Sequence, residues 1–357
     1  MDTLNVVIAD PDPESIELFQ KLCTSIHGLT VSGVARSAQM LVAKTKHVQP
    51  DIVFLNLTPD TGGIAVIDTL KKINPDLNVI IVNPMDQDPD ILVAALEAGA
   101  YDCVEKPVEI QSRQFNELRL YLLTVTGLLR SRKRFFKPGA PDHKNRFFMP
   151  GENKIQPPAP VYPHGRVEIV AIAASTGGPE ILSRIFSLLP KDLNVPILLV
   201  QHIPAEMTRF FAKSLNSKSE LDVAQARAGE LILPARVYLA PGGQHMVVSK
   251  PDAQGRRRIG LNHKPMVNSV RPSADVLFES IAQSYEDNVL VVILTGMGED
   301  GRHGVAMLKQ KTKCICVSQD AATCVVYGMP RAVDEAGLSD ESLDPLSITQ
   351  KIVMSVQ

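Results

Sequence analysis

Short apolar runs alternate with longer amphipathic stretches over the first 130 residues of the chain. Apolar runs that predict buried strands lie at residues 5–9, 29–35, 51–57, 79–82 and 103–104. Apolar positions spaced as on one face of a helix lie between and after them, at residues 14–24, 38–47, 64–73, 90–98 and 112–129. Strands that alternate with helices are typical of a parallel sheet. The pattern therefore predicts a doubly wound α/β domain over residues 1–130.

The alternation stops after residue 130 and starts again at residue 167. Residues 131–166 hold a basic run, Arg132-Lys133-Arg134, and prolines at 157–160 without sustained periodicity, and we interpret them as a linker. The basic run is interpreted as solvated, with docking of an acidic partner as the alternative. Beyond the linker, strands are predicted at 167–173, 195–200, 237–239, 289–294 and 315–317, and helices at 179–189, 205–215, 273–285 and 304–311. This second series predicts another doubly wound parallel-sheet domain, over residues 167–357.

Composition and charge narrow the classes of protein. The chain has 357 residues, 45% of them hydrophobic and 21% charged, which is typical of globular domains and excludes disorder throughout. With 37 basic and 39 acidic residues the net charge is −2, so the basic excess that nucleic-acid binding uses is missing. The apolar runs are far shorter than the roughly 18 residues that span a bilayer, and residues 1–3 begin no signal peptide. We therefore expect a cytoplasmic protein without nucleic acid as a partner.

The cysteines and histidines do not favour a disulfide framework or a metal site. The chain has five cysteines, an odd number, in apolar surroundings and without CxxC spacing. We expect them to be reduced thiols. His245, His263 and His303 lack the short spacing of zinc ligands, so zinc is disfavoured.

Chemically useful side chains follow three strands of the second series. The strand at 167–173 leads into Ser175 within an Ala-Ser-Thr-Gly-Gly-Pro turn, whose amides favour negative charge. The strand at 195–200 leads into His202, about one β/α unit further along the chain. The strand at 289–294 leads into a glycine-rich loop that contains Asp300. Because parallel strands end at a common edge of the sheet, a hydroxyl, an imidazole and a carboxylate are predicted to share that edge.

These three residue types suit a serine nucleophile. An imidazole takes the proton of the hydroxyl, and a carboxylate fixes the tautomer of the imidazole and stabilises its cation. Each residue also has a plainer interpretation: Ser175 as a helix cap or phosphate-binding turn, His202 as a structural histidine, and Asp300 as a helix cap. The order Ser, His, Asp and the absence of a Gly-x-Ser-x-Gly elbow disfavour the α/β-hydrolases. The turn at 175–178 lacks the Gly-x-Gly-x-x-Gly spacing of nucleotide-binding modules.

Six sequence blocks in the second series together resemble the CheB family. They are Ala-Ser-Thr-Gly-Gly-Pro at 174–179, Gln-His-Ile-Pro at 201–204, Leu-Ala-Pro-Gly-Gly-Gln-His-Met at 239–246, Arg-Pro-Ser-Ala-Asp-Val-Leu-Phe at 271–278, Leu-Thr-Gly-Met-Gly-Glu-Asp-Gly at 294–301 and Tyr-Gly-Met-Pro-Arg at 327–331. CheB proteins are chemotaxis response regulators in which a receiver domain precedes a protein-glutamate methylesterase domain. The resemblance covers nearly the whole chain except the linker. It implies a flavodoxin-like receiver followed by a three-layer α/β methylesterase domain.

The resemblance also implies catalytic roles for individual residues. It implies that Ser175 is the nucleophile, His202 the general base and acid, and Asp300 the orienting carboxylate. It further implies that the backbone N–H of Met297 donates to the oxyanion. Such a hydrolase requires neither a metal nor an organic cofactor.

The substrates implied by the resemblance are γ-glutamyl methyl esters and certain glutamines of methyl-accepting chemotaxis receptors. Thr176 and His245 are expected beside the substrate cleft. The implied partners are these receptors, in membrane-bound arrays that the protein contacts only peripherally, and a chemotaxis histidine kinase or another signalling protein.

The receiver part departs from the family pattern at the acidic residues that bind Mg²⁺ and accept phosphate. In a receiver, two acidic residues after the first strand and an aspartate after the third hold Mg²⁺, and the last of them accepts phosphate. Here Pro11 follows Asp10, and the third strand ends in Asn56. An amide is neither a phosphoryl nucleophile nor an anionic ligand. We therefore expect a pseudo-receiver that has lost phosphorylation.

Other residues of the receiver site leave one alternative open. Lys106-Pro107 matches the family's lysine and its cis-proline. An alignment shifted by two residues would make Asp12 a metal ligand and Asp60 the phosphate acceptor.

The sequence is compatible with two classes of function. The first is a serine hydrolase that acts on receptor glutamyl esters. The second is a non-catalytic signalling adaptor, which the altered receiver motivates. The presence of Ser175, His202 and Asp300 favours the hydrolase.

Overall fold

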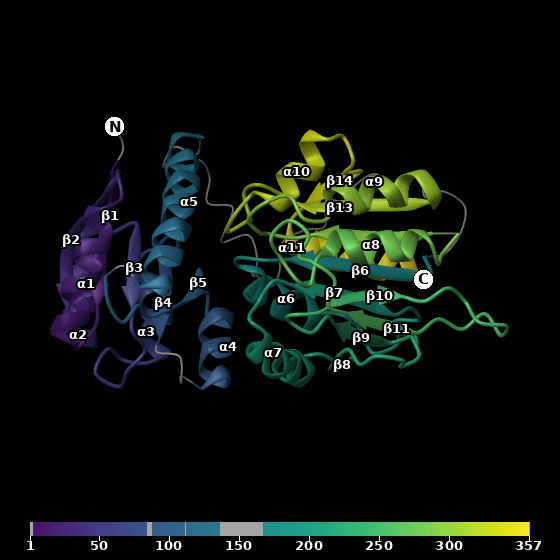
Figure 1. The fold of residues 1–357 in the computed structure, drawn as a ribbon, viewed down its shortest axis with the longest axis horizontal. Coiled ribbons are helices and arrows are strands. Elements are labelled where there is room, and N and C mark those ends of the chain that lie inside the picture. Colours follow the sequence, from purple (N-terminus) through teal and green to yellow (C-terminus); the bar gives the residue numbers. More distant parts are fainter. Residues whose placement is uncertain (1–2, 84–87, 111, 136–166, 287, 357) are drawn as a thin grey trace, which may run out of the picture. The chain divides into compact units, whose positions relative to one another are not determined.

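The computed structural model describes residues 3–83, 88–110, 112–135, 167–286 and 288–356, which divide into two compact units, Met1–Pro141 and Asp142–Gln357 (Figure 1). Each unit contains its own parallel sheet, so the predicted fold class of two α/β domains is confirmed. Helix α5 (Arg113–Phe135) extends beyond residue 130, so residues 131–135 of the predicted linker are helical. Residues 136–166, the rest of the predicted linker, lie outside the described residues.

The first unit alternates strands and helices as its apolar pattern predicts. Its elements are β1 (Leu4–Ala9), α1 (Pro13–Thr24), β2 (Leu29–Ala35), α2 (Ala38–Val48), β3 (Ile52–Leu55), α3 (Ala65–Ile73), β4 (Asn78–Asn83), α4 (Pro89–Glu97), β5 (Asp102–Glu105) and α5. The sheet order is β2-β1-β3-β4-β5, with every pair parallel. This is the flavodoxin-like order, whose direction of winding reverses between β1 and β3. The crevice at that reversal lies beside the residues that follow β1 and β3.

The second unit is a larger three-layer arrangement. Its elements are β6 (Ile169–Ala174), α6 (Gly178–Phe186), β7 (Ile197–Gln201), α7 (Ala205–Lys218), β8 (Asp222–Gln225), β9 (Arg236–Leu239), β10 (His245–Val248), β11 (Ile259–Asn262), α8 (Ala274–Ala282), β12 (Val289–Ile293), α9 (Arg302–Lys311), β13 (Cys314–Gln319), α10 (Met329–Glu335), β14 (Glu341–Leu343) and α11 (Pro345–Val356). Seven parallel strands form a sheet in the order β14-β13-β12-β6-β7-β9-β8. Strands β10 and β11 pair separately as an antiparallel hairpin.

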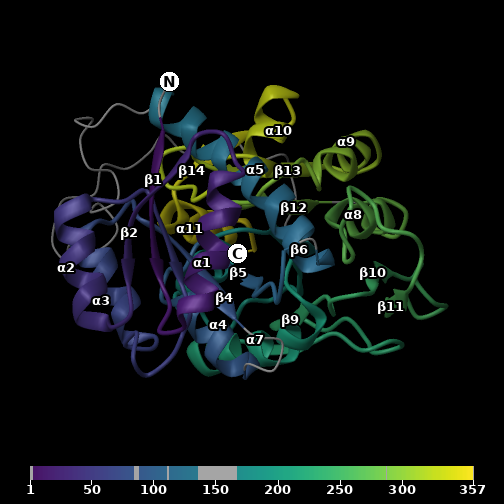
Figure 2. The ribbon, with the colours of Figure 1, turned by 60° about the vertical axis from the view of Figure 1, so that its left-hand side comes forward.

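Helices cover both faces of the seven-stranded sheet. Helices α8 and α9 pack against each other, and α8 also contacts β10 (Figures 1 and 2). Helix α6 contacts both α7 and α11. Every residue of β6, β7 and β12 is buried, because these central strands have neighbours on both edges and helices on both faces.

The winding of this sheet also reverses at its first strand. The chain runs from β6 outward to β7, and it returns to the other side of β6 only with β12. Strands β7 and β12 therefore both pair with β6. In an open parallel sheet such a switch point is where ligands bind, outside the carboxyl ends of the strands. The residues that follow β6, β7 and β12 are thus the ones to examine for chemistry.

Candidate active site

Ser175 and His202 lie at the ends of adjacent strands. In the pairing of β6 with β7, Ala174 is opposite Gln201, so the next residue on each strand is Ser175 or His202. The His202 N–H donates to the Ala174 carbonyl at 3.0 Å, and the Ser175 N–H donates to the Thr295 carbonyl at 3.0 Å. Because neighbouring strands are about 4.8 Å apart, the backbones of Ser175 and His202 are held side by side.

The turn after Ser175 is tightly fitted. Gly177 has a φ of 77°, in the left-handed region, and α6 begins at the next residue. The amide of Gln201 donates to the Ser175 carbonyl at 2.9 Å. A Cβ at Gly178 would lie 2.1 Å from Gln201 Oε1 and 2.9 Å from the Cβ of Ala174, so any other residue there would force its neighbours to shift. Both glycines are needed for the turn that presents Ser175 at the sheet edge.

A glycine also lets the loop after β12 approach Ser175. A Cβ at Gly296 would lie 2.7 Å from the Cβ of Ser175 and 2.5 Å from the Met329 sulfur. The next residue, Met297, is half-buried. Within the described part of the chain, its N–H donates to no hydrogen bond. The loop therefore presents an unused backbone donor next to the residue that contacts Ser175.

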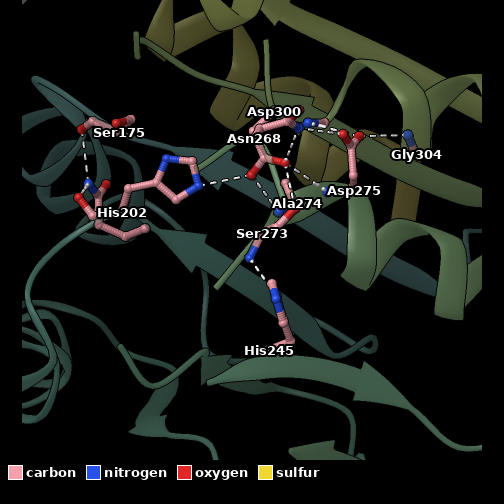
Figure 3. Close-up of polar contacts among 11 residues, drawn as sticks. Ser175, His202, His245, Asn268, Ser273, Ala274, Asp275, Asp300 and Gly304 are labelled. Atoms are coloured by element: carbon pink, nitrogen blue, oxygen red, sulfur yellow. Dashed lines mark hydrogen bonds and ion pairs between the residues drawn. The ribbon is translucent and has the colours of Figure 1, made fainter. Parts of the chain in front are cut away.

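Asp300 contacts His202 directly. The Asp300 carboxyl is buried, and its Oδ2 lies 2.9 Å from His202 Nε2. A carboxylate only accepts hydrogen bonds, so Nε2 carries a proton and Nδ1 of the neutral ring remains an acceptor. Figure 3 shows Ser175 on the Nδ1 side of the ring. Among the described residues the Ser175 hydroxyl forms no hydrogen bond to His202, and such contacts commonly tighten only when substrate is bound.

The beginning of helix α8 holds the Asp300 carboxylate. Ser273 Oγ donates to Oδ1 at 2.6 Å, the Ala274 N–H donates to Oδ2 at 2.6 Å, and the Asp275 N–H donates to Oδ1 at 3.2 Å. Burial raises the pKa of Asp300, but hydrogen bonds from His202, Ser273 and Ala274 outweigh it and hold that pKa below its usual value. The positive end of the helix dipole favours the same anion. Asp300 is therefore kept ionised while it faces His202.

A second carboxylate, Asp275, supports the first. Its Oδ1 accepts from the backbone N–H groups of Gly301, at 3.0 Å, and Gly304, at 2.7 Å, where α9 begins. The amide of Asn268 joins the two carboxylates, donating to Asp275 Oδ2 at 2.7 Å and Asp300 Oδ1 at 3.1 Å (Figure 3). Burial first, and then the charge of Asp300, raise the pKa of Asp275. These contacts fix the loop that carries Asp300.

His245 supports the site from inside the fold. Its side chain is fully buried, Nδ1 accepts from the Ser273 N–H at 3.2 Å, and Nε2 lies 3.0 Å from the Pro265 carbonyl. Both ring nitrogens are used by main-chain groups. The expected contact with substrate is wrong for this residue, because no atom of the ring is exposed to make it.

Thr176 remains a candidate for the cleft. It is half-buried directly after Ser175, and its carbonyl accepts from the Thr295 hydroxyl at 3.0 Å. This hydrogen bond joins the serine turn to the end of β12. Its predicted proximity to substrate remains a prediction.

Sequence reasoning missed Ser273 and Asn268 as direct partners of Asp300. The Pro-Ser-Ala-Asp sequence could have identified Ser273, since a serine before a helix with an acidic first turn is a helix-start signal. Asn268 lies in the loop between β11 and α8 with a φ of 52°, and no local pattern distinguishes it.

The receiver-like unit also has a buried carboxylate at its switch point. Asp10 Oδ2 accepts from Ser15 Oγ at 2.6 Å, Lys106 Nζ at 2.9 Å and Asn56 Nδ2 at 3.1 Å. Asp10 Oδ1 accepts from the Asp12 N–H at 2.9 Å. Burial raises the pKa of Asp10, but the hydrogen bonds from Ser15, Asp12 and Lys106 and the charge of Lys106 lower it by more. The charge of Asp10 is therefore balanced by side chains of the unit itself.

Two expectations for this unit can be compared with the structure. Asn56 follows β3 and contacts Asp10, whereas Asp60 is exposed in the turn beyond, which disfavours Asp60 as the acceptor. The Lys106–Pro107 peptide is not cis, contrary to expectation.

The described residues contain neither a cluster of metal ligands nor a membrane-spanning helix. In them no three His, Cys, Asp or Glu side chains gather as metal ligands would. None of their helices is both long and apolar enough to cross a membrane. All five cysteines are free thiols.

Comparisons with known proteins agree with this organisation. The family model described as CheB methylesterase matches residues 170–352, and that of the response regulator receiver domain matches residues 6–120. The chain belongs to the CheB methylesterase family. A relative from Treponema denticola named protein-glutamate methylesterase/protein-glutamine glutaminase is 32% identical, with 97% of each chain covered. A relative of the same name from Desulfotalea psychrophila is also 32% identical, with 100% of each chain covered.

A solved structure resembles the second unit of this CheB-family chain. It is the CheB methylesterase catalytic domain of Thermotoga maritima, which is 38% identical with a TM-score of 0.51. The match covers 53% of this chain and 98% of that domain.

Proposed function

We propose that this CheB-family chain is a protein-glutamate methylesterase that hydrolyses γ-glutamyl methyl esters of methyl-accepting chemotaxis receptors and deamidates receptor glutamines. The observation that carries the proposal is the hydrogen bond between His202 and the buried Asp300, beside Ser175 on the adjacent strand end. The names of the full-length relatives support the same reaction.

Acylation begins with the Ser175 hydroxyl. Its oxygen attacks the ester carbonyl carbon while His202 Nδ1 takes its proton, and Asp300 stabilises the resulting imidazolium through Nε2. In chymotrypsin-type proteases the two ring nitrogens have the opposite roles. The carbonyl oxygen becomes an anion, to which the Met297 N–H donates; such a donor typically contributes about 10²–10³ in rate. The intermediate then expels methoxide, which receives the proton from His202 and leaves as methanol.

Deacylation repeats these steps with water. His202 Nδ1 takes a proton from water, and the hydroxide attacks the carbonyl of the acyl-serine. Ser175 leaves and receives the proton from His202, so the net products are a glutamate side chain and methanol. With a glutamine substrate the first leaving group is ammonia. No residue in this scheme requires a metal or an organic cofactor.

The substitution Ser175→Ala tests the proposal. Methanol release from methylated receptor membranes is expected to vanish in the variant, because no other group replaces the nucleophile. Unchanged release would contradict the enzyme assignment. Absence of release from the unsubstituted chain as well would favour the alternative of a signalling adaptor.

We also propose that the receiver-like unit is not phosphorylated. Asn56 occupies the end of β3, and its amide donates to Asp10 where an acceptor carboxylate and Mg²⁺ would be needed. The catalytic unit would then be either constitutively active or controlled by a binding partner, such as a histidine kinase or another signalling protein. Incubation with acetyl phosphate and Mg²⁺ followed by intact-mass measurement is expected to give no acyl phosphate. A stoichiometric adduct would contradict this part of the proposal.

A further inference from the structure

A groove with three basic side chains lies between α7 and β8 of the second unit. It has a volume of about 460 Å³ and is lined by Arg209 and Lys213 of α7 and by Arg227, which follows β8, together with small and apolar residues. Arg209 and Lys213 are four residues apart and so lie on one face of the helix. All three cations are exposed. The groove is notable because the chain as a whole has a net charge of −2.

The three cations are not neutralised by the protein itself. Within the described part of the chain, their charged groups form no hydrogen bond or ion pair, and no acidic side chain lines the groove. Of the acids around β8, Asp222 pairs with Arg236 at 3.1 Å, and Glu230 pairs with the same arginine at 3.6 Å and accepts from the backbone N–H of Arg227 at 2.6 Å. Concentrated positive charge without counter-charge attracts an anionic ligand.

Part of the groove lining lies at the same edge of the sheet as Ser175. Helix α7 begins three residues after His202 and runs back along the sheet, so Arg209 lies only about 6 Å along the helix axis from its first residue. Strand β8 is parallel to β9, so its carboxyl end and the following Arg227 lie at the catalytic edge. Ser175 follows β6, and β6 and β8 are separated by β7 and β9, a distance of about 14 Å. A helical segment of about 20 residues is about 30 Å long, so one that lay across this edge from Ser175 toward β8 would reach the groove.

We infer that the groove binds an acidic segment of the substrate protein, next to the glutamyl group that is hydrolysed. This inference rests on the proposed function, because each turnover leaves a carboxylate on the substrate and a segment with several such groups becomes acidic. Recognition by side chains is favoured over pairing with the edge of the sheet, because Asn216 Oδ1 already accepts from the N–H of Val223 on β8 at 2.8 Å. The groove thereby increases the encounter rate and the affinity for substrates that are already partly demethylated.

Charge reversal in the groove tests the inference. The probes are two helical peptides of about 20 residues that carry one glutamyl methyl ester, the first with several glutamates and the second with glutamines at the same positions. The variant is Arg209→Glu/Lys213→Glu in the full chain. The matched control is Lys191→Glu/Lys311→Glu, which changes the net charge equally at exposed positions before β7 and β13, at the opposite edge of the sheet.

The measured quantity is the ratio of kcat/KM for the glutamate peptide to that for the glutamine peptide. At low salt we expect a ratio of about 10 or more for the unsubstituted chain and the control, falling toward one at about 0.5 M salt. In the groove variant the ratio is expected to fall to about one or below. A groove variant that keeps the ratio, or a control that loses it equally, would overturn the inference.

Binding separates this inference from the proposed function. With Ser175→Ala as background, fluorescence anisotropy of the labelled glutamate peptide is expected to show binding that the groove reversal removes. If the active chain releases no methanol from either peptide, the proposed function fails and this binding still tests the groove. Loss of binding to phosphatidylglycerol vesicles or to duplex DNA, with peptide binding unchanged, would assign the groove to a membrane or a nucleic acid and overturn the inference.

Discussion

The two sheets of this chain each have a buried aspartate at the switch point, and the partners of the two carboxylates differ. Asp10, after β1, is held by the ammonium of Lys106 and the amide of Asn56. Asp300, in the loop after β12, is held by the start of α8 and faces the imidazole of His202. In both, hydrogen bonds keep the pKa of the carboxyl below its usual value in spite of burial.

The difference shows that an ionised carboxylate at a sheet edge is not sufficient for chemistry. An ammonium and an amide do not exchange a proton readily at neutral pH, so the network around Asp10 is a fixed structural arrangement. An imidazole accepts a proton and returns it, so the contact between Asp300 and His202 can assist a reaction. The same fold rule brings both carboxylates to an edge, and the neighbouring residue decides their use.

The largest expected effect comes from Asp300→Asn. The amide neither stabilises the imidazolium nor fixes the ring tautomer, so kcat for methanol release is expected to fall by about 10⁴. Initial rates on a methyl-ester peptide measure this, with thermal unfolding as a control for folding. A loss of less than about tenfold would mean that the carboxylate of the second unit is as structural as that of the first.

Placing a carboxylate at position 56 tests whether the first unit lacks phosphorylation only because it lacks acidic groups. Asn56→Asp combined with Pro11→Asp gives the first unit three acidic groups around Lys106, the set that binds Mg²⁺ in receivers. With acetyl phosphate and Mg²⁺ we expect an acyl phosphate well above the background of the unsubstituted chain, detected by intact mass. If instead the unsubstituted chain is phosphorylated and Asp60→Asn abolishes this, Asp60 is the acceptor. That result would contradict the assignment of position 56 to the acceptor position.

A smaller effect is expected from Ser273→Ala. It removes one hydrogen bond to ionised Asp300, which raises the pKa of that carboxyl and lowers kcat/KM by about tenfold or more. Because the pKa of Asp300 is depressed, its contribution to stability is present above the unfolded value of about 3.9 and is lost as pH falls through the lower folded value. The variant is expected to lose that contribution at a higher pH.

Urea unfolding and kcat/KM between about pH 3 and 7 measure both effects. Ser187→Ala removes an exposed serine hydroxyl and serves as the matched control. Equal profiles for the two variants would show that Ser273 does not hold Asp300.

An effect on stability alone is expected at a carboxyl group that neither site uses. Burial raises the pKa of Asp102 to about 6, although Tyr121 and the Cys103 N–H donate to it. The folded state therefore binds this proton more tightly than the unfolded state, and ionisation above about pH 4 costs stability. Asp102→Asn is expected to stabilise the first unit by about 1–3 kcal/mol at pH 7 and to have little effect at pH 4. Denaturant unfolding at both pH values checks this, with Asp60→Asn as the exposed control; equal changes at both pH values would contradict it.

Much of the fold is predictable because its central strands are apolar throughout. β6, β7 and β12 are buried on both faces, so their sequences are continuous apolar runs. Helices α10 and α11 are not predicted, and neither are the short strands β8, β10, β11 and β14, in which polar and apolar positions are mixed. Such strands depend on tertiary packing more than on a local pattern.

The site is predictable only as far as strand ends determine it. The rule for parallel sheets brings Ser175, His202 and Asp300 to one edge. It does not indicate that α8 begins against Asp300, because the contacts of Ser273 and Asn268 with Asp300 join residues about 30 positions apart. The error for His245 has a related cause, since burial of a single histidine in a hairpin cannot be read from its neighbours in sequence.

The proposed function depends on the activation of the Ser175 hydroxyl by His202 and Asp300. The most direct measurement is the rate at which a fluorophosphonate modifies the full chain, with the modified residue located by peptide mass spectrometry. We expect modification at Ser175 alone, none in Ser175→Ala, and rates at least about 100-fold lower in His202→Ala and Asp300→Asn. Modification at another residue would contradict this activation. So would equal rates in the unsubstituted chain, His202→Ala and Asp300→Asn.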